Sequence, residues 1–162
     1  MEPEIFHSLS WSELVRALVR LSASLILGGA IGWERELRGR SAGLRTHMLV
    51  AVGSTSFMDL AMQLTTPNGE RDPTRVIQGV ATGVGFLGAG VILKMKDQQR
   101  VRGLTTAASI WATAALGVVV GAGGLVFATV LALLALVVLS LLRRVERRWS
   151  PADAQSDADL SD

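Results

Sequence analysis

The spacing of its charged residues is the feature that most constrains this chain. Charges cluster before residue 45, from Glu70 to Arg75, from Lys94 to Arg102 and after Arg143, and the stretches between these clusters are nearly free of them. A charge at the centre of a membrane-spanning helix costs roughly 2.5–3.5 kcal/mol, so a bilayer imposes this pattern. With 49% hydrophobic and 19% charged residues, the chain has too little polar surface to cover a soluble core. The sequence therefore predicts a membrane protein.

Five apolar stretches have the length that spans a bilayer, and they are listed here by number: 14–33, 46–64, 76–93, 104–120 and 125–142. At a rise of 1.5 Å per residue, such stretches cross a hydrocarbon core of about 30 Å. The alternation typical of barrel strands is missing from the sequence. We expect an all-α, polytopic membrane helical bundle with five transmembrane helices over residues 14–142. An interfacial segment is expected at 1–13, and a basic anchor with a disordered acidic tail at 143–162.

Basic residues predict the orientation of this bundle. They gather in the connections after the first and third stretches and in the tail: Arg35, Arg38, Arg40, Arg45, Lys94, Lys96, Arg100, Arg102, Arg143, Arg144, Arg147 and Arg148. With five crossings, all three regions lie on one side, while the two arginines at 70–75 on the other side are balanced by two acids. The positive-inside rule places the N-terminus outside and the C-terminus in the cytoplasm. Arg16 and Arg20 oppose this count, so they need partners or must reach the interface.

A carboxylate inside the second stretch, Asp59, is a candidate functional group. Asp59 stands five residues before the outer end of its stretch, about 7–8 Å deep, and Arg20 stands six residues into the first stretch, about 9 Å deep. These similar depths predict an intramembrane ion pair that neutralises both charges. Two alternatives stay open: Asp59 handles cations or protons, or it reaches the outer water alone.

Glycines are concentrated in the third stretch, at Gly79, Gly83, Gly85, Gly88 and Gly90. The G-x-G-x-x-G pattern at 83–88 lies inside an apolar span and has no acid about twenty residues later, which argues against a dinucleotide site. Small residues let helix backbones approach each other in lipid, so we interpret these as helix-packing glycines. The pairs Gly28 with Gly32 and Gly117 with Gly121 have the same spacing. The alternative is a flexible or broken third helix that lines a cavity.

Polar residues in the fourth stretch recur with helical spacing. Thr105, Ser109 and Thr113 stand at i, i+4 and i+8, which places them in one stripe that must face protein or water. We expect interhelical hydrogen bonds, with Gln78 and Thr82 of the third stretch as the natural partners.

Motifs of enzymes and metal centres are missing from the sequence. The chain has no cysteine, and its two histidines, His7 and His47, fall on opposite sides, so a zinc site is not expected and His47 is interpreted as an interfacial residue. Two of the three acids on the cytoplasmic connections flank Arg35, which weakens a magnesium site there. We expect no catalytic residue, no metal and no cofactor.

Four ordered sequence blocks resemble the signature of the MgtC/SapB family: GWERE at 32–36, AGLRTHMLV at 42–50, GFLGAGVI at 85–92, and VRGLTTAASIWATAALG at 101–117. This resemblance covers roughly residues 15–142. It implies a multi-pass protein of the bacterial inner membrane, linked to growth at low magnesium and, as a virulence-associated trait, to survival inside host cells. It further implies a non-enzymatic regulatory role, since the best-studied member is thought to restrain the ATP synthase. Longer members carry a soluble C-terminal domain, and this chain resembles a small form without it.

Carried over by position, the resemblance gives these candidate functional polar residues: Glu34, Arg35, Arg45, Thr46, Arg102, Thr105 and Thr106. All of them fall near the predicted cytoplasmic face, which indicates a shared site or contact surface. The expected partners are membrane lipid and another integral membrane protein or complex, with a homo-oligomer as an alternative. Nucleic acid is not expected, since the net charge is only +2. The second interpretation of function is a small magnesium transporter or channel, with Asp59 and the polar stripes along its path.

Overall fold

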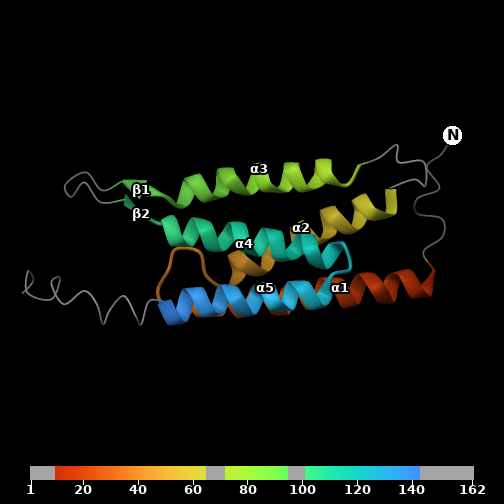
Figure 1. The fold of residues 1–162 in the computed structure, drawn as a ribbon, viewed down its shortest axis with the longest axis horizontal. Coiled ribbons are helices and arrows are strands. Elements are labelled where there is room, and N and C mark those ends of the chain that lie inside the picture. Colours follow the sequence, from red (N-terminus) through yellow and green to blue (C-terminus); the bar gives the residue numbers. More distant parts are fainter. Residues whose placement is uncertain (1–9, 65–71, 95–100, 143–162) are drawn as a thin grey trace, which may run out of the picture.

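Five helices run back and forth along one long axis in the computed structural model of the chain (Figure 1). The structure describes residues 10–64, 72–94 and 101–142. The helices are α1 (Trp11–Leu37), α2 (Leu44–Leu64), α3 (Thr74–Val91), α4 (Leu104–Gly121) and α5 (Leu125–Val137), and α5 continues into the π-helical turn η2 (Val138–Leu142). The expected all-helical architecture is confirmed. The expected anchor and tail at 143–162 lie outside the described residues, as do residues 1–9 of the expected interfacial segment.

Helix α1 begins at a capping box, which extends it beyond the apolar stretch. The Ser10 hydroxyl accepts a hydrogen bond from the Glu13 amide at 3.3 Å, and the Glu13 carboxylate accepts one from the Ser10 amide at 3.1 Å. This reciprocal pair satisfies two amide groups that the first turn would otherwise leave unpaired. Residues 11–13 therefore belong to α1 in the structure, with the Trp11 side chain exposed.

Among the described helices, α1 and α4 are long and apolar enough to cross a membrane, judged by length and composition. A third apolar helical segment, Leu125–Ser140, is shorter. Large apolar side chains also point outward from the bundle, for example Val126 and Phe127 on α5 and Phe86 on α3. An outer surface of this kind suits hydrocarbon better than water.

Helix α3 has distinct signals at its two ends. At its start, Asp72 Oδ1 accepts a hydrogen bond from the Thr74 amide at 2.8 Å, and Oδ2 accepts one from the Thr74 hydroxyl. Both bonds lower the pKa of Asp72, and the bond from the hydroxyl contributes more than the bond from the amide. At its end, α3 stops at Val91 and Ile92 is extended, so the helix ends two residues before the expected boundary at residue 93.

A two-stranded antiparallel ladder joins α3 to α4. It pairs β1 (Leu93–Lys94) with β2 (Val101–Arg102). Gly103 then turns the chain into α4 with a φ of +97°, and its α-carbon is so close to the Val91 carbonyl that a side chain would collide with it. Both conditions require glycine. This ladder was not expected from the sequence, because strands of two residues are too short to carry an alternating pattern.

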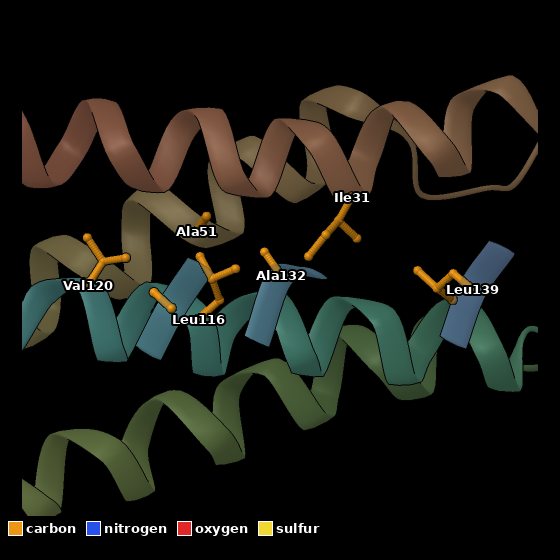
Figure 2. Close-up of a cluster of buried hydrophobic side chains, with 7 residues drawn as sticks. Ile31, Ala51, Leu116, Val120, Ala132 and Leu139 are labelled. Atoms are coloured by element: carbon orange, nitrogen blue, oxygen red, sulfur yellow. The ribbon is translucent and has the colours of Figure 1, made fainter. Parts of the chain in front are cut away.

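Helix α4 occupies the centre of the bundle and contacts α1, α2, α3 and α5. The main core cluster lies between α1, α2, α4, α5 and η2, and it consists of Ile31, Ala51, Leu116, Val120, Ala128, Ala132 and Leu139. Figure 2 shows six of these side chains, labelled, spaced along the axis of the bundle between the helices. Helix α3 lies at the outer edge of the bundle and packs mainly against α4, with little contact to α2 (Figure 1).

Two glycine pairs bring helix backbones together inside this core. A side-chain carbon on Gly28 would lie 2.7 Å from Ala51 Cβ, and one on Gly32 would lie 2.8 Å from Leu44 Cα, so α1 and α2 touch there. On α4, a carbon on Gly121 would lie 2.6 Å from the Thr55 carbonyl oxygen, and Gly117 is in equally close contact with the α2 backbone. These distances leave no room for a methyl group, as expected for small-residue helix packing in lipid.

Candidate functional site

Buried polar side chains gather at one end of the bundle, where α1 ends and α2 and α4 begin. This end is on the left in Figure 1. Four of the polar residues there are at most 4% exposed: Arg35, His47, Thr106 and Ser109. Buried polar groups nearly always have hydrogen-bond partners. The partners of these four side chains therefore define the geometry of the site.

His47 joins α2 to α4 through a buried hydrogen-bond network. Its Nδ1 lies 2.9 Å from the Gly43 carbonyl oxygen, to which it donates, and its Nε2 lies 3.1 Å from Ser109 Oγ. Ser109 Oγ also lies 2.8 Å from the Thr106 carbonyl oxygen. The Ser109 hydroxyl has a single proton. When the His47 ring is neutral, the hydroxyl therefore donates either to Nε2 or to the Thr106 carbonyl, and not to both at once. The interpretation of His47 as an interfacial residue was wrong, since its side chain is fully buried between helices.

The polar stripe of α4 has a different partner from the one that sequence spacing suggested. Ser109 contacts His47 on α2, and Thr113 donates to the Ser109 carbonyl within α4. On α3, Gln78 and Thr82 are exposed, and the Thr82 hydroxyl donates to the Gln78 carbonyl of its own helix. Two residues of the predicted stripe, Ser109 and Thr113, are buried, whereas Thr105 is exposed. The expected bonds to α3 were wrong because Ser109 faces α2.

Arg35 is buried beside His47, and its guanidinium group is only partly satisfied. Its Nη1 lies 3.4 Å from Glu34 Oε2, while Nε and Nη2 are buried and have no hydrogen-bond partner in the described part of the chain. Glu34 is shared, because it also forms an ion pair with Arg38 Nε. The second acid nearby, Glu36, accepts a hydrogen bond from the Leu44 amide at 3.0 Å and so caps α2.

The remaining candidates from the sequence lie at the same end but toward the surface. Arg45, Arg102 and Thr105 are exposed, and Thr46 is half-buried. No hydrogen bond or ion pair joins these four residues within the described ranges. The structure therefore brings Glu34, Arg35 and the buried Thr106 into the helix junction and leaves the others around its rim.

At the opposite end of the bundle, the structure brings Arg20 and Asp59 together in an ion pair. The second carboxylate oxygen of Asp59 accepts a hydrogen bond from Gln63 Nε2 at 3.0 Å. Both side chains are partly buried, with 27% of Arg20 and 14% of Asp59 exposed. Since both carboxylate oxygens are engaged, the geometry favours mutual neutralisation over a free intramembrane acid.

Glycines on α3 face mostly outward. A carbon on Gly88 would lie 3.5 Å from Ala107 Cβ on α4, which is ordinary packing contact, whereas Gly79, Gly83, Gly85 and Gly90 have open space at that position. Two of these four line a groove of about 700 Å³ between α2 and α3. The groove is formed by Leu49, Val50, Gly53, Ser54, Phe57, Arg75, Val76, Gly79, Val80, Gly83, Val84 and Leu87. A smaller groove of about 270 Å³ lies between α3 and α4 beside Trp111.

Comparison with known proteins gives a consistent set of relatives. The model of the MgtC family matches residues 21–148. The protein MgtC of Brucella abortus (strain 2308) is 44% identical over 133 residues, which are 82% of this chain and 54% of that protein. The magnesium-transporter candidate YhiD of Escherichia coli (strain K12) is 49% identical over 111 residues, 65% of this chain and 51% of YhiD. Protein SrpB of Synechococcus elongatus is 42% identical over 137 residues, 79% of this chain and 75% of SrpB.

The chain spans about half the length of the Brucella and Escherichia relatives that it matches. No solved structure gives a significant match.

Proposed function

The chain belongs to the MgtC family, and from this premise we propose that it is a multi-pass inner-membrane protein that regulates another membrane complex when magnesium is scarce. Family membership and the apolar helices identify it as a magnesium-related bacterial membrane protein. The regulatory role, the location in the inner membrane and the topology are our proposal. It is a non-enzymatic role, in which the protein acts by binding.

We propose five crossings with the N-terminus outside and the C-terminus in the cytoplasm. The support is that the five helices run back and forth (Figure 1) and that Arg35 and Arg38 at the end of α1 and Arg102 before α4 lie at one end of the bundle. Because the chain has no cysteine, each introduced one is unique. A membrane-impermeant maleimide should label the exposed position Ala122→Cys in intact cells, and Ser41→Cys only after permeabilisation. Labelling of Ser41→Cys in intact cells would contradict the orientation.

The groove between α2 and α3 carries the proposal of a partner. Its walls are apolar, and Gly53, Gly79 and Gly83 expose backbone in it, with open space beside each α-carbon. In lipid, small residues favour helix association because they let a second backbone come close. We propose that a transmembrane helix of the regulated complex lies in this groove. Helix α4 is mostly buried, so we assign the contact with the partner to α2 and α3.

A matched pair of substitutions on α3 tests this docking. Gly83→Leu fills the groove, whereas Gly85→Leu puts the same side chain on the same helix outside the groove lining, again into open space. After pull-down and crosslinking from native membranes at low magnesium, the partner should be lost with Gly83→Leu and retained with Gly85→Leu. Growth at low magnesium should follow the same order. Equal recovery of the partner with both variants would contradict docking in the groove.

Magnesium transport is the second candidate, and the name of the relative YhiD favours it. Two contacts weigh against a path through this bundle: Asp59 is engaged by Arg20 and Gln63, and Ser109 by His47. The test is magnesium flux into liposomes that contain the purified protein. Flux that Asp59→Asn abolishes would favour transport and contradict a purely regulatory role, while absence of flux together with a copurifying complex would favour regulation.

A further inference from the structure

Arg35 is a buried charge whose surroundings do not satisfy it. It is 2% exposed, and its Nε and Nη2 have no hydrogen-bond partner among the described residues. Removing a guanidinium from water without replacing its hydrogen bonds is strongly unfavourable, and native structures rarely leave such groups unpaired. The single contact, from Nη1 to Glu34 Oε2 at 3.4 Å, is at the weak end of hydrogen-bond distances. A group in this state requires a further hydrogen-bonding partner.

The two unpaired nitrogens have a common direction. In a guanidinium group, Nε and Nη2 form one edge, and their N–H groups point the same way as a two-pronged fork. This fork fits two oxygens of one carboxylate or phosphate group. Since Glu34 takes Nη1 instead, the edge that recognises anions in a bidentate manner is the one left free.

The residues around Arg35 favour the binding of an anion, and the acids among them are not free to occupy its place. Glu34 is shared with Arg38, and Glu36 is engaged by the Leu44 amide. Arg38 and Arg40 lie close enough to act electrostatically on Arg35. The described part of this end thus has more arginine charge than acid charge, and Arg38 and Arg40 add positive potential at Arg35.

The first turn of α4 lies at the same end of the bundle (Figure 1). Ser109 contacts His47, which lies within electrostatic range of Arg35, and the buried Thr106 is three residues closer to the start of α4. Gly103, the residue directly before α4, offers no side-chain cap to the first-turn amide groups. An uncapped helix N-terminus attracts negative charge through its free N–H groups and its dipole.

We propose that Arg35 and the first turn of α4 form a binding site for a phosphate group, supplied by an anionic lipid headgroup or by free inorganic phosphate. The proposal depends on neither the groove nor the regulated complex. Both sources of phosphate are present at the end of a membrane-embedded bundle, and the test below separates them.

The experiment uses the full chain in a maltoside detergent free of phospholipid. One arm adds sodium phosphate and compares it with sodium chloride at equal ionic strength. The other adds phosphatidylglycerol and compares it with a neutral galactolipid. The readouts are the thermal unfolding midpoint and the Arg35 Nε–H resonance in a ¹⁵N spectrum. At about ten times Kd, binding should raise the midpoint by about 3 °C and shift that resonance. A response in the phosphate arm identifies a free anion, and a response only to phosphatidylglycerol identifies a lipid headgroup.

The variants assign the response to the buried fork. Arg35→Gln should abolish the shift in midpoint, and Arg35→Lys, which keeps the charge but has no fork, should lose most of it. Arg16→Gln removes an exposed arginine near the start of α1, away from this end, and should retain the shift. If Arg35→Gln does not fold, the response of Arg35→Lys and the wild-type Arg35 resonance test the proposal instead. The proposal is overturned if the wild type responds to neither phosphate nor phosphatidylglycerol, or if Arg16→Gln loses the response as fully as Arg35→Lys.

Discussion

The same spacing of small residues has opposite outcomes in two regions of this molecule. On α1 and α4, glycine pairs at i and i+4 bring the backbones of these helices so close to α2 that no methyl group fits between them. On α3, Gly79 and Gly83 have the same spacing, and nothing lies within 4 Å of the position that a side-chain carbon would take. One region is a closed core, and the other leaves its small residues facing a groove.

Polar bonds between helices also distinguish the two regions. The Thr55 hydroxyl on α2 donates to the Gly117 carbonyl on α4 at 2.9 Å, and His47 contacts Ser109 across the same interface. The described side-chain bonds of α3 stay at its own start or along its own backbone, as that of Thr82 does. Small residues permit close approach, and hydrogen bonds between helices decide where it is used.

Gly117→Ala should have the largest effect, because it introduces a methyl group into the closed core. The new carbon would collide with the Ala51 carbonyl and lie 2.8 Å from Ser54 Cβ. We expect a loss of about 2–3 kcal/mol in the free energy of unfolding, since overpacking outweighs the gain in helix propensity. Denaturant titration in detergent micelles measures it. An unchanged stability would mean that α2 and α4 are not in contact at this position.

Ser109→Ala should have an intermediate effect, because it removes a polar bond that closes the core. His47 Nε2 would be left buried and unpaired, so we expect a loss of about 1–2 kcal/mol. Ser56→Ala is the matched control, since its hydroxyl is exposed and donates only to the Val52 carbonyl of its own helix. The same titration should show almost no change for the control. Equal losses of stability in the two variants would show that the bond between Ser109 and His47 does not stabilise the core.

Gly83→Ala should have a smaller effect of the opposite sign. Its methyl group enters open space, so the gain in helix propensity is not offset by a collision. We expect a stabilisation of about 0.5–1 kcal/mol in the isolated protein. A loss of stability in purified, partner-free protein would show that this face of α3 is packed after all, and the contrast between the two regions would disappear.

Asp72→Asn should have the smallest effect, and it acts at the start of α3 alone. The two bonds from Thr74 lower the pKa of Asp72, so its ionised form is stabilised in the folded state. This contribution is fully present above the ordinary value of 3.8 and is lost as the pH falls through the lowered pKa. The stability difference between wild type and variant should therefore be small at pH 7 and vanish toward pH 2. A difference that grows on acidification would contradict the assignment.

Sequence alone predicted the features that hydrocarbon dictates. The expected stretch 104–120 matches α4 to within one residue, because helix length is set by bilayer thickness. Depth arithmetic on Arg20 and Asp59 found two residues that the structure pairs. Which helix faces which could not be predicted, since periodicity gives the faces of one helix and not their neighbours. The bond from Ser109 to His47, rather than to α3, and the burial of Arg35 both depend on that arrangement.

The β1–β2 ladder and the tight turn at Gly103 tie one end of α3 to α4, and this has a mechanical consequence. Helix α3 has 18 residues, so it is about 27 Å long. A hinge at its Val91 end moves the Thr74 end by about 0.5 Å for each degree of rotation, from this same rise per residue. The arm of this lever includes Arg75, Gly79 and Gly83, which line the groove. A rotation of α3 about this end would therefore change the groove width most at the end farthest from the ladder.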